Sequence, residues 1–349
     1  MTAPSPAHLP VRPDWLAQSR EQAIEPELPI VDSHHHLWDR PGQRYLFDDL
    51  LGDMRSGHDI RATVFVQSRS MYRASLPPEL QPVGEVEFAN GVAAQAASGL
   101  YGRRLACAAI VGFADLMLGD RVEPVLESLH RAGGDRLRGV RNQTAWHPDP
   151  DIISNPVPPQ PGLLTHPQFL AGAHRLPAHR LTLDVWAYHT QLVEVAELAH
   201  SCPDTLIVLD HLGGPLGIGP YRNHREQVFA GWSVDLKTLA DLPNVVLKLG
   251  GLAMRVGGFD FQENPEPPSS TALALVWAPY VMTAIELFGP ARCMFESNFP
   301  VDKGMVGYVS LWNAYKIMTK DLTRSERYEL FCGTAVRTYQ LPAADLELP

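Results

Sequence analysis

The sequence predicts an α/β protein folded as a (β/α)8 TIM barrel, with some distortion allowed for. Short apolar, β-branched runs recur about eight times along the 349 residues, and a helix-like stretch follows most of them. Parallel strands need such crossover connections, and strands covered on both faces are apolar almost throughout. Eight units match the strand number of a closed barrel. An open doubly wound sheet fits the same alternation and is the alternative.

The eight candidate strands are short apolar runs, and polar residues lie at or beyond the end of most of them. In chain order they are residues 28–35, 61–68, 105–114, 137–144, 179–188, 205–212, 244–251 and 292–299. The stretches between them are amphipathic and are predicted to form the outer helices, for example residues 87–100, 121–132, 191–202 and 274–288.

An N-terminal arm and two Pro-rich loops lie outside these units. We divide the chain into an arm, residues 1–28, and a barrel, residues 29–349. "SNPVPPQPG" (154–162) follows the fourth strand and "NPEPPSS" (264–270) follows the seventh, and both are poor helix or strand material. Both loops are therefore expected on the C-terminal face, where such barrels carry their active sites.

Composition favours a small-molecule partner. The net charge is −10 and no stripe of Lys and Arg is present, which argues against nucleic acid. No secretory signal and no run of 18 apolar residues is found, so we expect a cytoplasmic protein without a membrane partner. The four scattered cysteines are expected to be reduced. A homo-oligomer is left open.

The first strand ends in "VDSHHHLWDR", with three consecutive histidines. Side chains alternate along a strand, so Asp32, His34 and His36 are expected on one face and His35 on the other. Histidines at positions i and i+2 can reach one metal ion or one anion. Histidine clusters also occur on protein surfaces, so this segment alone does not distinguish a functional site from a surface cluster.

Polar residues at the ends of the other strands favour a functional site over a surface cluster. Each taken alone is more often a packing residue or half of a surface ion pair, but in a barrel they converge on one site. They are Gln67, Arg141, His189, Asp210, His211, Asn298 and, slightly further on, Asp302. Trp38 and Trp186 flank them and could form an aromatic wall, although packing within the barrel explains them nearly as well.

Four segments together resemble the amidohydrolase superfamily: "VDSHHHLWD", "RGVR", "VLDHLGGP" and "ESNFPVD". The most similar branch is that of the amidohydrolase-related proteins, which includes 2-pyrone-4,6-dicarboxylate lactonase and sugar-acid lactonases such as L-fuconolactonase. The resemblance spans residues 29–341. It implies a barrel with a hydrolytic site at the strand ends.

By this resemblance, His34 and His36 are the strand-one pair, His189 is the strand-five histidine and His211 is the strand-six histidine. His34, His36 and His189 would hold one divalent ion, zinc or manganese, if a metal is used. The family contains metal-dependent members, and its lactonase branch is known for working without a metal, so the cofactor is left open. Arg141 would hold a substrate carboxylate or polarise the substrate carbonyl.

The strand-eight position departs from the family pattern. Where the family usually has an Asp that activates water, this chain has Asn298. An amide can orient water but cannot take its proton at neutral pH. Glu296, Asp302 and a histidine such as His211 are the candidates to replace it, and we favour a histidine because its intrinsic pKa suits the role.

The resulting hypothesis is a hydrolase that opens a lactone of a small carboxylated substrate. His34, His36, His189, His211, Asn298 and Asp302 form the expected catalytic set, and Arg141, Gln67, Trp38 and Trp186 the expected substrate-binding set. The alternatives are metal-dependent decarboxylation of an aromatic or muconate-like acid, amide hydrolysis, and a barrel that only binds a ligand. The last is favoured by Asn298 alone.

Overall fold

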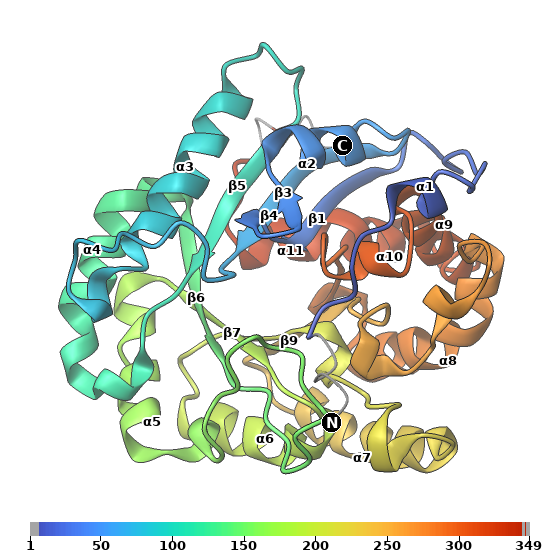
Figure 1. Cartoon of the computed structure of the whole chain (residues 1–349). Helices are drawn as coiled ribbons and strands as arrows, with labels where there is room; N and C mark the ends of the chain where they lie inside the picture. The colour runs from blue at the N-terminus through green and yellow to red at the C-terminus, as the bar shows by residue number, and fades with distance from the viewer. Residues whose placement is uncertain (1–6, 344–345, 347–349) are drawn as a thin grey trace.

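The computed structural model describes residues 7–343 and 346 and confirms the barrel (Figure 1). Eight parallel strands lie in chain order around one sheet. They are β1 (Pro29–His35), β4 (Asp59–Val66), β5 (Leu105–Gly112), β6 (Leu137–Gln143), β7 (Thr182–Trp186), β8 (Ile207–Leu209), β9 (Val245–Leu249) and β10 (Cys293–Phe295). Each overlaps a strand predicted from sequence, and neighbours in the chain pair in the sheet, which excludes the doubly wound order.

A helix follows each strand and belongs to the outer ring (Figure 1). In order these are α2 (Phe47–Met54), α3 (Val83–Ala97), α4 (Glu123–Gly133), α5 (Pro167–Ala173), α6 (Leu192–Ser201), α7 (Arg225–Ala240), α8 (Ser270–Phe288) and α9 (Tyr308–Met318). Outside this repeat lie α1 (Pro13–Leu16), the hairpin β2 (Trp38–Arg40) and β3 (Gln43–Tyr45), α10 (Arg324–Tyr328) and α11 (Thr334–Thr338).

The barrel closes irregularly between β10 and β1. Asn298 N donates to His34 O at 2.9 Å and His36 N donates to Phe299 O at 2.7 Å. The regular pairing there is reduced to a single bridge between His35 and Phe299. The expected distortion therefore falls where the polar ends of the first and last strands meet.

The interior of the barrel is polar at the end that faces the pocket and apolar at the opposite end. At the apolar end, Val64, Val111 and Met294 pack with Tyr339 and Leu341 of the C-terminal segment. This apolar layer supports the buried charges above it.

Helix α8 has the length and mean hydropathy that a membrane span requires, the only one to do so in the described part of the chain. Its Trp277 and Val281 are fully buried in the core around the sheet. A buried core helix passes the same test of length and composition.

Candidate active site

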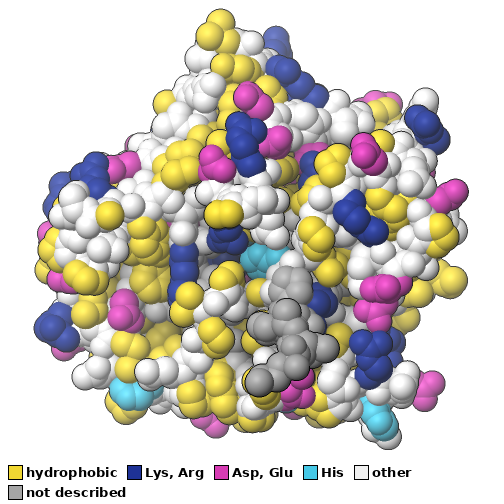
Figure 2. Space-filling view, in the orientation of Figure 1, with side chains coloured by type: hydrophobic (Ala, Val, Ile, Leu, Met, Phe, Trp, Pro, Cys, Tyr) yellow, Lys and Arg dark blue, Asp and Glu magenta, His cyan; other side chains and the backbone are white. Residues whose placement is uncertain are grey.

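A cavity of about 270 Å³ lies at the carboxyl ends of the strands. Basic side chains and a histidine gather near the hollow in the middle of this face (Figure 2). The Pro-rich loop 154–162 contributes residues 154–157 to the wall, as expected for a loop on this face. The other lining residues include His8, His36, Trp38, Arg40, Arg69, Arg141, Gln143, Trp186, His211 and Asn298.

His34 and His36 point inward and lie with their Nε2 atoms 3.3 Å apart. His36 Nδ1 is 2.7 Å from Val66 O, which only accepts, so Nδ1 carries the proton of the neutral ring. His34 Nδ1 is 3.0 Å from Glu296 Oε2, which favours a proton there too. Burial lowers the pKa of both imidazoles, helped by Lys248 for His34. Both Nε2 atoms therefore present lone pairs, and that of His34 accepts from Arg141 NH1 at 3.2 Å.

His211 is oriented by a buried carboxylate. Its Nδ1 lies 2.6 Å from Glu296 Oε1, so Nδ1–H donates to Glu296 and Nε2 is left free. Burial opposes ionisation of Glu296, but His211 and His34 outweigh burial and lower the carboxyl pKa. A Cβ on Gly251, whose φ is +67°, would lie 2.5 Å from His211 Cβ, so glycine permits this close approach.

Two buried cations face three buried carboxylates beneath the pocket. Lys248 Nζ lies 2.7 Å from Asp184 Oδ2 and 3.0 Å from Asp210 Oδ1, and Arg141 NH1 lies 3.1 Å from Asp210 Oδ2. Glu296 is the third carboxylate. Since an unpaired buried charge is costly, the excess negative charge calls for a proton on the histidines or a bound cation.

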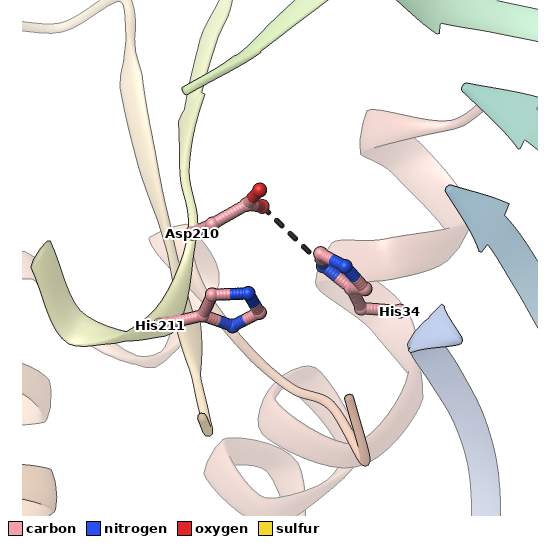
Figure 3. A group of neighbouring side chains, drawn as sticks. All are labelled: His34, Asp210 and His211. Carbon is pink, nitrogen blue, oxygen red and sulfur yellow. Dashed lines mark ion pairs between the residues drawn. The ribbon is translucent and has the colours of Figure 1, made fainter. Parts of the chain in front are cut away.

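Asp210, His34 and His211 come close enough together to hold such a cation (Figure 3). One ligand atom from each lies within 4.8 Å of the others, and all three residues are buried. The ion pair drawn between His34 Nδ1 and Asp210 Oδ1 measures 3.5 Å.

Asn298 is held by Asp302. Asn298 Nδ2 donates to Asp302 Oδ1 at 2.8 Å, which leaves Asn298 Oδ1 facing the pocket without a partner among the described residues. Burial raises the pKa of Asp302 well above its usual range. Asp302 does not line the cavity, so the structure places it behind Asn298 rather than beside the substrate.

The structure does not bring His189 to the other histidines. His189 Nδ1 accepts from Leu216 N at 3.3 Å, and its ring packs edge-on against Tyr221 with centroids 5.0 Å apart. The predicted ligand set of His34, His36 and His189 is therefore not assembled. His189 begins a short helical turn after β7, and its ring is not part of the group formed by His34, Asp210 and His211.

Asp32 is also absent from the predicted face. The pairing of β1 with β4 shifts register between Asp32 and His35, which breaks the simple alternation. Asp32 Oδ2 instead accepts from the Tyr308 hydroxyl of α9 at 3.0 Å.

Of the expected substrate-binding residues, Arg141, Trp38 and Trp186 line the cavity, and Gln67 does not. Gln67 O accepts from Arg141 NH2 at 2.6 Å, and the buried Gln67 amide has no partner among the described residues.

Sequence reasoning missed His8, Arg40 and Arg69 as lining residues. Arg40 ends the histidine segment itself and could have been noticed. Nothing local marks the other two.

The family model described as "Amidohydrolase" matches residues 31–341. The uncharacterized protein y4mH of Sinorhizobium fredii is 30% identical over 90% of this chain and 99% of its own. An L-fucono-1,5-lactonase of Burkholderia multivorans is 28% identical over 89% of this chain and 96% of its own. A solved amidohydrolase of Burkholderia multivorans with bound zinc is 27% identical, covers 90% of this chain and 99% of its own, and has a TM-score of 0.69.

Proposed function

The chain belongs to the amidohydrolase family, and from that premise we propose that it opens the lactone ring of a small substrate that carries a free carboxylate. One observation carries the choice of substrate. Arg40, Arg69 and Arg141 line the cavity and no Asp or Glu does so among the described lining residues, although the chain has a net charge of −10. Such a pocket favours an anionic ligand.

The reaction can be assigned to named atoms. Arg141 holds the substrate, and its fixed charge stabilises the oxyanion that forms at the lactone carbonyl. Asn298 Oδ1 orients the attacking water, and His211 Nε2 takes the proton as the new C–O bond forms. Glu296 stabilises the resulting imidazolium. His211 then returns the proton to the ring oxygen as the ester C–O bond breaks, giving a hydroxy acid.

The donor set also fits one divalent cation, zinc or manganese. The unprotonated Nε2 atoms of His34 and His36 lie 3.3 Å apart. Two nitrogen ligands of a tetrahedral zinc ion, each with a Zn–N bond of about 2.05 Å, are separated by about the same distance. The excess negative charge of the buried cluster favours a cation in the same place. His34, His36 and Asp210 would hold it, which leaves His211 Nε2 free to act as the base, and the relative with bound zinc supports this choice. A bound ion would polarise the carbonyl and lower the pKa of water.

Metal content is expected to depend on His36 and not on His189. We expect about one equivalent of zinc or manganese in protein purified without a His-tag or chelator, because two lone pairs converge there. The measurement is elemental mass spectrometry of wild type, His36→Ala and His189→Ala. We expect loss of most metal in the first variant and retention in the second. Less than about a tenth of an equivalent in wild type, with no uptake on adding metal, would contradict the metal site.

Lactone opening is tested with a panel of carboxylated lactones and acids. We expect proton release from a carboxylated lactone such as 2-pyrone-4,6-dicarboxylate, and a fall in kcat/KM of about a hundredfold or more for Arg141→Lys, because lysine keeps the charge but loses the fork. L-fucono-1,5-lactone tests whether the free carboxylate is needed. Release of carbon dioxide from an aromatic acid, with no lactone opened, would favour the decarboxylase instead.

A further inference from the structure

The N-terminal arm reaches the rim of the cavity and is bound there by specific contacts. Trp15 is buried, and its Nε1–H donates to Asn264 O at 3.0 Å. Arg12 NH2 donates to Gln262 O at 2.8 Å. A Cβ on Gly304 would lie 2.6 Å from Leu9 Cβ, so the barrel leaves room for the arm at that point.

Side chains of helix α9 bind backbone carbonyl groups of the rest of the arm. Lys316 Nζ donates to Ile24 O at 2.9 Å and to Glu25 O at 2.8 Å, and Asn313 Nδ2 donates to Gln22 O at 2.8 Å. Both side chains are buried. The described part of the arm is thus attached at both ends, which fixes where His8 lies.

His8 completes a wall that we call the aromatic rim, formed by Trp38, His8, Ser154 and Trp186. The His8 ring stacks on Trp38, with centroids 5.6 Å apart and planes 10° from parallel. His8 Nε2 lies 3.2 Å from Ser154 O, and the Trp186 Nε1–H donates to Ser154 Oγ at 2.9 Å. His8 therefore joins the segment after β1 to the loop after β6, and all four residues line the cavity.

We propose that the arm is part of the active site and that His8 contacts the substrate there as a specificity-determining residue. The inference rests on the proposed function for the reaction that the substrate undergoes, whereas the binding of a carboxylate beside His8 does not depend on that function. Because Ser154 O only accepts, His8 Nε2 carries the proton. Burial, with Arg40 and then Arg141, lowers the pKa of His8 to about 4. His8 thus contributes a neutral aromatic surface beside the arginines rather than a charge.

Citrate is the probe, since it tests carboxylate binding without turnover. We expect the Kd of citrate, measured by calorimetry, to rise at least fivefold in His8→Ala, because the rim opens between Trp38 and Ser154. Val11 is an exposed residue three positions further along the arm, and Val11→Ala is the control. In this variant the Kd of citrate should stay within twofold of wild type. On any lactone that is opened, His8→Ala should raise KM while kcat changes less than threefold.

The outcomes separate this inference from the proposed function. An unchanged citrate Kd in His8→Ala overturns the role of His8 and leaves the proposed function standing. Failure of wild type to bind citrate overturns the inference, because the cavity then does not hold a carboxylate beside His8. Weaker citrate binding in His8→Ala, with no lactone opened by wild type, overturns the proposed function alone. If His8→Ala fails to fold, His8→Gln keeps a donor for Ser154 O and removes the stacked ring.

Discussion

Replacing His211 with alanine is expected to lower kcat for lactone opening by about a thousandfold, because general acid–base catalysis contributes about 10²–10⁴. His211 combines a free Nε2 at the cavity with a carboxylate partner, Glu296, at 2.6 Å. Asn298 cannot take the proton in its place. The measurement is steady-state kinetics on the lactone identified in the panel.

His189→Ala is the matched control for His211→Ala. Both variants remove one histidine that begins the turn after a barrel strand, and these strands, β7 and β8, are neighbours. The His189 ring contacts Leu216 and Tyr221 rather than the cluster, so kcat should stay within about threefold of wild type. Equal losses in the two variants would contradict the placement of the catalytic base on His211.

Replacing Lys248 with methionine is expected to lower the free energy of unfolding by about 3–5 kcal/mol, the usual cost of removing one partner from a buried ion pair. Lys248 is fully buried, and its loss leaves Asp184 and Asp210 without their common cation. The hydroxyl of Tyr339 still donates to Asp184 Oδ2 at 2.7 Å, but it carries no charge. Urea unfolding followed by circular dichroism measures the difference.

Arg44→Met is the control for Lys248→Met. It removes the cation from an exposed pair with Asp49, 3.3 Å apart, and should change the free energy of unfolding by about 1 kcal/mol or less. A Lys248→Met protein as stable as this control would show that the buried cluster does not need Lys248.

The strands and the inward pair of histidines could be predicted because both depend on local periodicity. The rule that side chains alternate along a strand correctly predicted His34 and His36 on one face and His35 on the other. The same rule was wrong for Asp32, because the pairing of β1 with β4 shifts register after it. It could not place His189, since a residue beyond the end of a strand follows the geometry of its own turn.

The resemblance predicted the family correctly, and the family model covers most of the barrel. It did not indicate how the strand-eight position works with Asn298 in place of Asp. That answer needs two distances: from His211 to Glu296, which are 85 residues apart in the chain, and from Asn298 to Asp302, which both lie in the segment after β10.

By itself the sequence determined the barrel, the family and most of the polar residues at the strand ends, because these are written in short periodic segments and their order. Only the tertiary structure decided which of these residues meet. The pairing of Lys248 with two carboxylates, the absence of His189 from the cluster and the arrival of His8 from the arm all depend on contacts between segments far apart in the chain. No local pattern encodes such contacts; they arise when the closed sheet and the arm are packed together.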